Sequence, residues 1–119
     1  MLTELTPQQK KALIAEYRKT PRPMGLYRVL NEQSGRFVVG THRDVQARLN
    51  RFLANLRTGT EMNKALLADW QAAAGEGFRF EVLDTLEPAD EPGYDPTDDL
   101  RTLEALWWET SGADRAMHY

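Results

Sequence analysis

The side chains that could do chemistry in this chain are carboxylates, arginines and tyrosines rather than thiols or clustered imidazoles. The 119 residues contain no cysteine, which excludes thiol nucleophiles, iron–sulfur clusters and zinc sites built from thiolates. The two histidines, His42 and His118, cannot by themselves build a histidine-rich metal site. Any metal ion would therefore be held mainly by carboxylates.

The charges of the chain are divided between its two halves. Residues 36–64 carry six basic and two acidic side chains, whereas residues 76–104 carry ten acidic and two basic ones. A basic first half could form a face that binds a polyanion, and solvated faces of opposite sign are the alternative.

Two short glycine motifs, an arginine and a late glutamate lie in order along the chain. Gly25-Leu26-Tyr27 begins one predicted strand, Val38-Val39-Gly40 ends the next, and Arg48 follows Gly40 by eight residues. Glu104 stands just ahead of two adjacent tryptophans. This ordered set, over roughly residues 24–109, resembles the GIY-YIG nuclease family.

The resemblance implies a site of three residues. In active members of the family a tyrosine helps to deprotonate the attacking water, an arginine stabilises the phosphate, and a glutamate holds one divalent cation, Mg²⁺ or Mn²⁺. Tyr27, Arg48 and Glu104 occupy these positions. A guanidinium and a metal ion both counter the negative charge that develops on a phosphodiester under attack. We therefore expect the three side chains to meet in one cleft.

Two positions that are polar in the family are apolar here. Val38 stands where the second tyrosine belongs, and Phe52 stands where many members have histidine or tyrosine. Neither can donate a hydrogen bond, and the loss of an activating group commonly costs about a hundredfold or more in rate. His42 could substitute as a proton carrier, and an ordinary exposed histidine is the alternative. We expect a domain that acts on DNA with weak or lost metal-dependent hydrolysis.

Two other functions stay open. One is a DNA-binding module without hydrolysis, and the other is a protein-interaction scaffold, including a homodimer, that uses Trp107, Trp108 and the acidic loop. Each selected residue also has a plain structural interpretation: Tyr27 as packing, Arg48 as a solvated helix face and Asn63 as a helix cap. The candidate contacts to DNA are Arg36, Arg43, Arg51, Asn63 and Lys64.

Capping and periodicity predict the elements that must position these residues. Thr6-Pro7 opens a helix over 6–19, and Asp44 caps a second over 45–57, whose apolar residues form one stripe. A third helix is expected from 62 or 63 to 74, and a fourth from Thr97 to about Ser111. Alternating residues predict three strands, at 25–31, 36–40 and 78–83, with an acidic loop over 87–97.

The order α-β-β-α-α-β-α predicts an α+β fold, a small three-stranded, mainly antiparallel sheet flanked by helices. We expect one domain over residues 1–119. No apolar run is long enough to cross a bilayer and the first residues lack the pattern of a signal peptide, so we expect a cytoplasmic protein.

Overall fold

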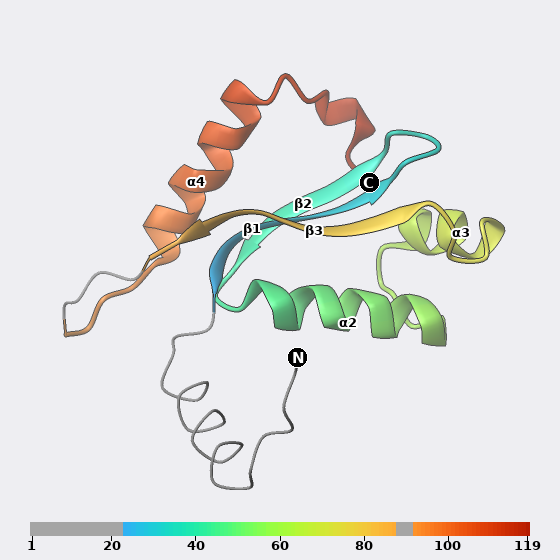
Figure 1. The fold of residues 1–119 in the computed structure, drawn as a ribbon, viewed down its shortest axis with the longest axis horizontal. Coiled ribbons are helices and arrows are strands. Elements are labelled where there is room, and N and C mark those ends of the chain that lie inside the picture. The colour runs from blue at the N-terminus through green and yellow to red at the C-terminus, as the bar shows by residue number, and fades with distance from the viewer. Residues whose placement is uncertain (1–22, 88–91) are drawn as a thin grey trace, which may run out of the picture.

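A computed structural model describes residues 23–87 and 92–119, and its fold is a three-stranded sheet with helices on both faces (Figure 1). The strands are β1 (Met24–Asn31), β2 (Phe37–His42) and β3 (Phe78–Leu86). The helices are α2 (Val45–Thr58), α3 (Lys64–Ala72), α4 (Thr97–Thr110) and the short 3₁₀ turn η1 (Arg115–Met117). The helix predicted over 6–19 and residues 88–91 of the acidic loop lie outside the described residues.

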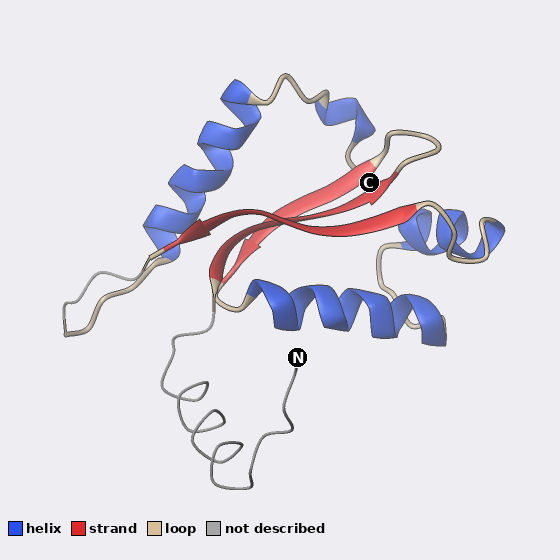
Figure 2. Cartoon of the chain, viewed as in Figure 1, coloured by secondary structure: helices blue, strands red, loops and turns tan. Residues whose placement is uncertain are grey.

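The sheet has the order β2-β1-β3, and both pairings are antiparallel (Figure 2). β1 and β2 form the predicted hairpin, whose turn uses Gly35 at a φ of 77°. The pairing of β1 with β3 is irregular between Leu26 and Tyr27, where β3 contains an extra residue. These results confirm the predicted α+β fold with an antiparallel sheet.

Gly25 is needed because β3 approaches β1 closely at this irregularity. A β-carbon at position 25 would overlap the carbonyl oxygen of Asp84 and lie 2.8 Å from the Cα of Thr85. Only glycine leaves room for this backbone contact. The first glycine motif therefore has a structural reason that does not depend on chemistry.

Two apolar clusters lie on opposite faces of the sheet. α2 and α3 cover one face, where Tyr27 and Val38 pack against an apolar stripe of α2 that includes Leu49, Phe52 and Leu56. α4 covers the other face, which is the upper side of the sheet in Figure 1. There the buried residues Leu26, Phe37 and Val39 are packed against by partly buried side chains that include Leu103, Trp107, Trp108 and Met117.

The ends of the helices follow the predicted capping, with small shifts. Asp44 accepts a hydrogen bond from the backbone N–H of Ala47 and so caps α2, and Gly59 ends it in the left-handed region. Asn63 caps α3 in the same way, through the N–H of Leu66. α3 ends at Ala72, two residues before the prediction, whereas β2 and β3 extend two and three residues beyond theirs.

The segment that follows α4 returns to the sheet, which the sequence did not predict. His118 forms a parallel bridge with Phe37, and the N–H of Tyr119 donates to the carbonyl of Phe37 at 2.8 Å. This contact covers part of the open edge of β2, because β2 is otherwise paired only with β1.

None of the helices in the described ranges, 23–87 and 92–119, is long and apolar enough to cross a membrane.

Candidate functional site

Tyr27 lies in the core on the α2 side of the sheet and not on an open surface. Its side chain is 6% exposed, and its ring packs against Phe52 with centroids 5.8 Å apart. Val38 is buried in the same cluster. Phe52 thus packs on the phenol ring, and both apolar residues occupy positions where polar groups would be needed to activate a water molecule.

Arg48 is held by the same phenylalanine. Its guanidinium carbon lies 4.2 Å from the centroid of the Phe52 ring, a cation–π geometry. No ion pair joins Arg48 to a carboxylate within the described part of the chain, so its N–H groups are left to solvent or a ligand. Phe52 thus links Tyr27 and Arg48, because its ring contacts both.

His42 and Arg51 stand beside Arg48 at the end of β2 and on α2. Together with Ala47 these three residues line a small pocket of about 90 Å³. The Nδ1 of His42 accepts the backbone N–H of Asp44 at 2.9 Å, so the neutral ring carries its proton on Nε2. This pocket combines two guanidinium groups with an imidazole N–H, all of which are donors suited to phosphate oxygens.

Glu104 lies on α4 and lines a different pocket, of about 310 Å³, with Val39, Trp108, Arg115 and His118. Glu104 as a residue is partly buried. The His118 Nε2 accepts the backbone N–H of Val39 at 3.2 Å, and its Nδ1 is 2.9 Å from the carbonyl of Tyr119. The imidazole is therefore occupied by the backbone.

The residues of this pocket fit a divalent cation only in part. Within the described ranges no three His, Asp or Glu side chains lie close enough together to hold a metal ion. Glu104 is one carboxylate without an ion pair to any described residue, and Mg²⁺ is commonly held by one or two carboxylates that water and substrate phosphate complete. The donor set therefore suits a cation that binds together with a phosphate.

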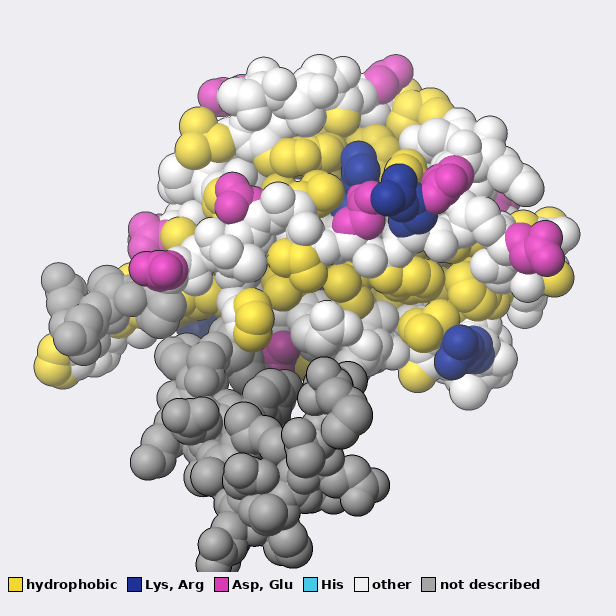
Figure 3. Space-filling view, in the orientation of Figure 1, with side chains coloured by type: hydrophobic (Ala, Val, Ile, Leu, Met, Phe, Trp, Pro, Cys, Tyr) yellow, Lys and Arg dark blue, Asp and Glu magenta, His cyan; other side chains and the backbone are white. Residues whose placement is uncertain are grey.

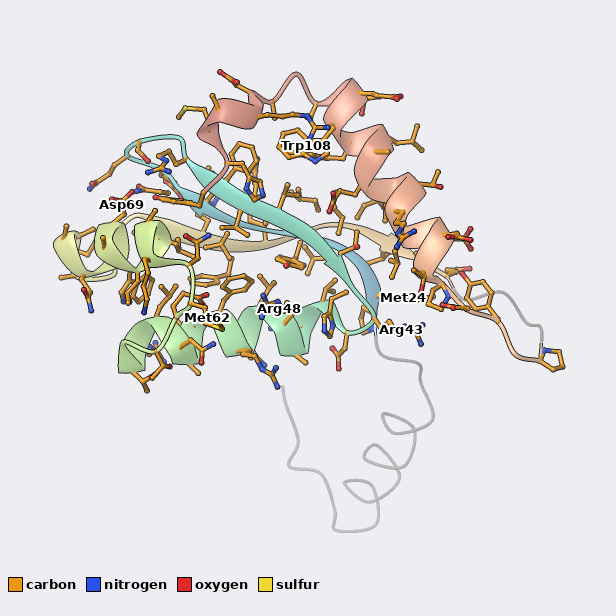
Figure 4. The ribbon with its side chains drawn as sticks, turned by 180° about the vertical axis from the view of Figure 1, so that it is seen from behind. Met24, Arg43, Arg48, Met62, Asp69 and Trp108 are labelled. Atoms are coloured by element: carbon orange, nitrogen blue, oxygen red, sulfur yellow. The ribbon has the colours of Figure 1, made fainter. Side chains whose placement is uncertain are left out.

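The two pockets lie on opposite sides of β2. Figure 4 shows Arg48, on α2, below this strand and Trp108, on α4, above it. The structure thus brings Tyr27 and Arg48 together through Phe52 and places Glu104 on the other face. Contrary to the expectation from the sequence, the structure does not bring all three side chains into one cleft.

The other candidate contacts to DNA differ in whether their side chains already have a partner within the protein. Arg43 pairs with Asp95 at 2.8 Å, and Arg36 stacks over the Tyr119 ring at 4.3 Å, with Asp69 at 3.9 Å. Asn63 uses its carbonyl oxygen to cap α3. The remaining two candidates, Arg51 and Lys64, are exposed.

The charges over the sheet are mixed and do not form a uniform basic face. In the view of Figure 3, the dark-blue Lys and Arg side chains at the centre adjoin magenta Asp and Glu side chains. Arg28 pairs with Glu81 at 2.6 Å, and Arg79 lies 3.2 Å from Glu32. A basic face for a polyanion is therefore supported best on α2, around Arg48 and Arg51.

The sequence did not single out Arg115, Trp108 or His118 as site residues near Glu104. The scaffold hypothesis from the sequence places Trp108 at an interface, whereas its ring packs on Phe37 with centroids 5.8 Å apart. The signal that could have found Arg115 and His118 is weak, because it depends on the return of the last residues to β2.

No family model matches the chain, and no curated protein matches it either. Two solved structures are similar to it. One is a point mutant of the catalytic domain of intron endonuclease I-TevI, with a TM-score of 0.56 and 18% identity, over 75% of this chain and 84% of that one. The other is the catalytic domain of homing endonuclease I-TevI, with a TM-score of 0.54 and 21% identity, over 72% and 85%.

The likeness spans most of both chains and includes the three-stranded antiparallel sheet with its flanking helices. At this level of identity it establishes the fold. The chain therefore has the fold of the catalytic domain of I-TevI, a GIY-YIG homing endonuclease.

Proposed function

We propose that this chain binds DNA through its phosphates and hydrolyses phosphodiester bonds only slowly, in a reaction that depends on Mg²⁺ or Mn²⁺. The observation that carries the proposal is the position of Arg48. Its guanidinium is fixed on the Phe52 ring, has no carboxylate partner among the described residues, and lines a pocket with His42 and Arg51. A fixed and unpaired guanidinium is what a developing phosphate charge requires.

The roles of the chain's own residues follow from what each can donate or accept. Arg48 and Arg51 would bind phosphate oxygens, and His42 would donate its Nε2–H to an oxygen of the same phosphate or of the leaving group. Glu104 would hold the divalent cation, which when bound supplies Lewis-acid stabilisation of phosphate oxygens. Because the Glu104 pocket lies on the face of the sheet opposite Arg48, this stabilisation would act poorly on a phosphate held by Arg48, which is a further reason for slow hydrolysis.

Hydrolysis is slow in this proposal because Tyr27 is shielded. A phenol acts as a base only when nearby positive charge lowers its pKa and when it can reach the attacking water. The Tyr27 ring packs against Phe52 in an apolar cluster that also contains Val38, and the residue is 6% exposed. The apolar neighbours therefore favour binding over turnover.

The test is the nicking of supercoiled plasmid in Mg²⁺ or Mn²⁺, with EDTA as the blank. Slow nicking by the wild-type protein should disappear in Glu104→Gln and in Arg48→Ala, and should persist in Arg57→Ala, which removes an equal charge at the far end of α2. Nicking that survives Glu104→Gln would show that the activity comes from a contaminant.

A variant that gains activity would test directly whether the apolar residues Val38 and Phe52 limit hydrolysis. The double variant Val38→Tyr with Phe52→His restores the two polar side chains that the family has at these positions. We expect its nicking rate to rise by about tenfold or more if the missing groups limit hydrolysis. Thermal unfolding of the variant must be measured alongside, because both positions are in the core.

The non-hydrolysing DNA-binding module is the second candidate, and the burial of Tyr27 favours it. In that case plasmid nicking is absent from every variant, while DNA binding weakens steeply with salt and weakens further in Arg48→Ala. An interaction scaffold receives less support, because Trp107 and Trp108 pack on Phe37 in the interior of the α4 face.

A further inference from the structure

β3 is an edge strand whose outer side has no strand partner among the described residues. The sheet order is β2-β1-β3, so β3 pairs with β1 alone, whereas the open side of β2 is partly covered by the last residues of the chain. In Figure 1, β3 crosses in front of the other two strands, and no described helix passes in front of it. Its nine residues contain no proline, so this edge is a template on which another strand can pair.

The pairing with β1 determines which backbone groups of β3 face the open edge. The N–H of Glu32 donates to the carbonyl of Gly77, the residue before β3. Because the side of hydrogen bonding alternates along a strand, Gly77, Arg79 and Glu81 direct their backbone groups to β1. The residues between and beside them direct their N–H and C=O groups to the open edge, and these are Phe78, Phe80 and Val82.

One register lets two copies of this edge pair with each other. If Phe80 lies opposite Phe80 of a second copy in antiparallel orientation, Phe78 lies opposite Val82 of that copy. Every outward N–H and C=O of these residues then finds a partner across a two-fold axis. The paired segment ends before Leu83, the extra residue at the irregularity between β3 and β1.

The side chains are complementary in the same register. Arg79 lies opposite Glu81 of the second copy, and the two-fold axis repeats this pair, so opposite charges meet at both places. The Arg79 side chain is 60% exposed and lies 3.4 Å from Glu81 of its own chain, so the second copy extends an existing charge pair. On the other face, Val82, which is 42% exposed, lies beside Phe78 of the second copy and is covered by it.

We propose that the open edge of β3 is a self-association surface, where two copies of the chain form an antiparallel β3–β3 pair centred on Phe80 and join their sheets into one. The occupant is a second copy, because the charges of Arg79 and Glu81 complement the same strand when it is turned around. The two-fold axis is perpendicular to the sheet, so α2 of both copies lies on the same face of the joined sheet. The inference is independent of the proposed function, since it requires no DNA.

Sedimentation velocity of the full chain over a range of concentrations measures the dimer. Val82→Pro removes an N–H that faces the open edge and leaves the bonds to β1, so it should weaken the dimer by about tenfold or more. Thr85→Pro is the matched control, because Thr85 lies on the same strand beyond the paired residues and its N–H donates to the Asp84 side chain. It should leave the dimer within about twofold of wild type, and thermal unfolding shows whether both proline variants are folded.

The charge pairs are tested by reversal. Arg79→Glu places like charges opposite each other at both places and should weaken the dimer by about fivefold or more. Arg101→Glu is the control, because it makes the same charge change at an exposed position on α4, away from β3. Its dimer should stay within about twofold of wild type.

The register is tested by cross-linking, because the chain has no cysteine of its own. Facing residues of a non-hydrogen-bonded antiparallel pair have Cα atoms about 4.5 Å apart, which suits a disulfide. A mixture of Arg79→Cys and Glu81→Cys should therefore form disulfides between the two variants faster than either variant forms them alone. Glu81→Cys also loses the pair with Arg28, so its thermal unfolding is measured alongside.

Three results would overturn the inference. A wild-type chain that stays monomeric up to about 1 mM would leave the edge without a second copy and open to a strand of another protein. A dimer that neither Val82→Pro nor Arg79→Glu weakens would use another surface. Disulfides that form no faster in the mixture than in the single variants would exclude the register centred on Phe80. A dimer in a chain that does not bind DNA would overturn only the proposed function.

Discussion

A β-carbon at Gly40 would lie 2.7 Å from the phenolic oxygen of Tyr27, so these two residues fit together only because position 40 has no side chain. They are also register partners in the pairing of β1 with β2. The ring of Tyr27 cannot move away easily, because Phe52 packs against it. The second glycine motif therefore fixes the place of the tyrosine that the first one supplies.

Gly40→Ala should destabilise the protein by forcing Tyr27 out of this position. Overpacking of a filled core costs about 1–3 kcal/mol, and we expect a loss in that range in the free energy of unfolding measured with urea. Adding Tyr27→Phe removes the closest atom and should restore part of the loss. Equal stability of Gly40→Ala and wild type would contradict the steric account.

Asp95 should weaken DNA binding by holding Arg43. The two side chains pair at 2.8 Å although each is nearly two-thirds exposed. Hydrogen bonds from the hydroxyl and the backbone N–H of Thr97 lower the pKa of Asp95, so it stays charged well into the acidic range. Asp95→Asn keeps an acceptor for Thr97 and should raise DNA affinity about two- to threefold at low salt.

The control for Asp95→Asn is Asp98→Asn, an equal charge change in the first turn of α4. A gain that acts through Arg43 should disappear when Arg43→Ala is added to Asp95→Asn. If the gain persists in that double variant, net charge alone explains it.

Asn63 is expected to contribute more to stability than to DNA binding. Its side-chain oxygen accepts the N–H of Leu66, and removal of such a cap costs about 1 kcal/mol. Asn63→Ala should lower the midpoint of urea unfolding, while Asn63→Asp, which retains the cap, should not. A loss of DNA affinity in Asn63→Asp without a loss of stability would instead support the predicted contact with DNA.

The hydrogen bonds that hold the Tyr119 side chain in place should be lost at high pH. Tyr119 donates to Asp69 at 2.6 Å and accepts from Asn31 at 3.0 Å. Burial and then the bond to Asp69 raise the pKa of Tyr119 above its usual value near 10. Because the folded-state pKa is the higher one, this stabilisation is complete below pH 10 and is lost as pH rises through the folded pKa.

Absorbance of the phenolates near 295 nm measures this titration directly. The bond to Asp99 also raises the pKa of Tyr94, so Tyr119→Phe should remove one of the late-titrating components and cost about 1 kcal/mol at neutral pH. Tyr94→Phe is the comparison, because Tyr94 also donates to a carboxylate, that of Asp99, but on an exposed surface. An unchanged titration curve in Tyr119→Phe would contradict the assignment.

The sequence by itself determined the elements and their order. The apolar stripe of α2, the caps at Asp44 and Asn63, and the glycine turn of the hairpin are local signals, because each depends on residues only a few positions apart. The antiparallel hairpin followed from the alternating residues on either side of that turn. The positions of Tyr27, Arg48 and Glu104 on a strand and two helices were therefore predictable.

Only the tertiary structure decided which of these residues meet. Phe52 was predicted as an apolar replacement, but its contact with both Tyr27 and Arg48 depends on how α2 lies on the sheet. The return of the C-terminal residues to β2, which brings Arg115 beside Glu104, depends on a few contacts between distant residues, such as Val39 with His118 and Asp69 with Tyr119. Such contacts leave no periodic pattern in the sequence, because they arise from the packing of whole elements and not from the spacing within one.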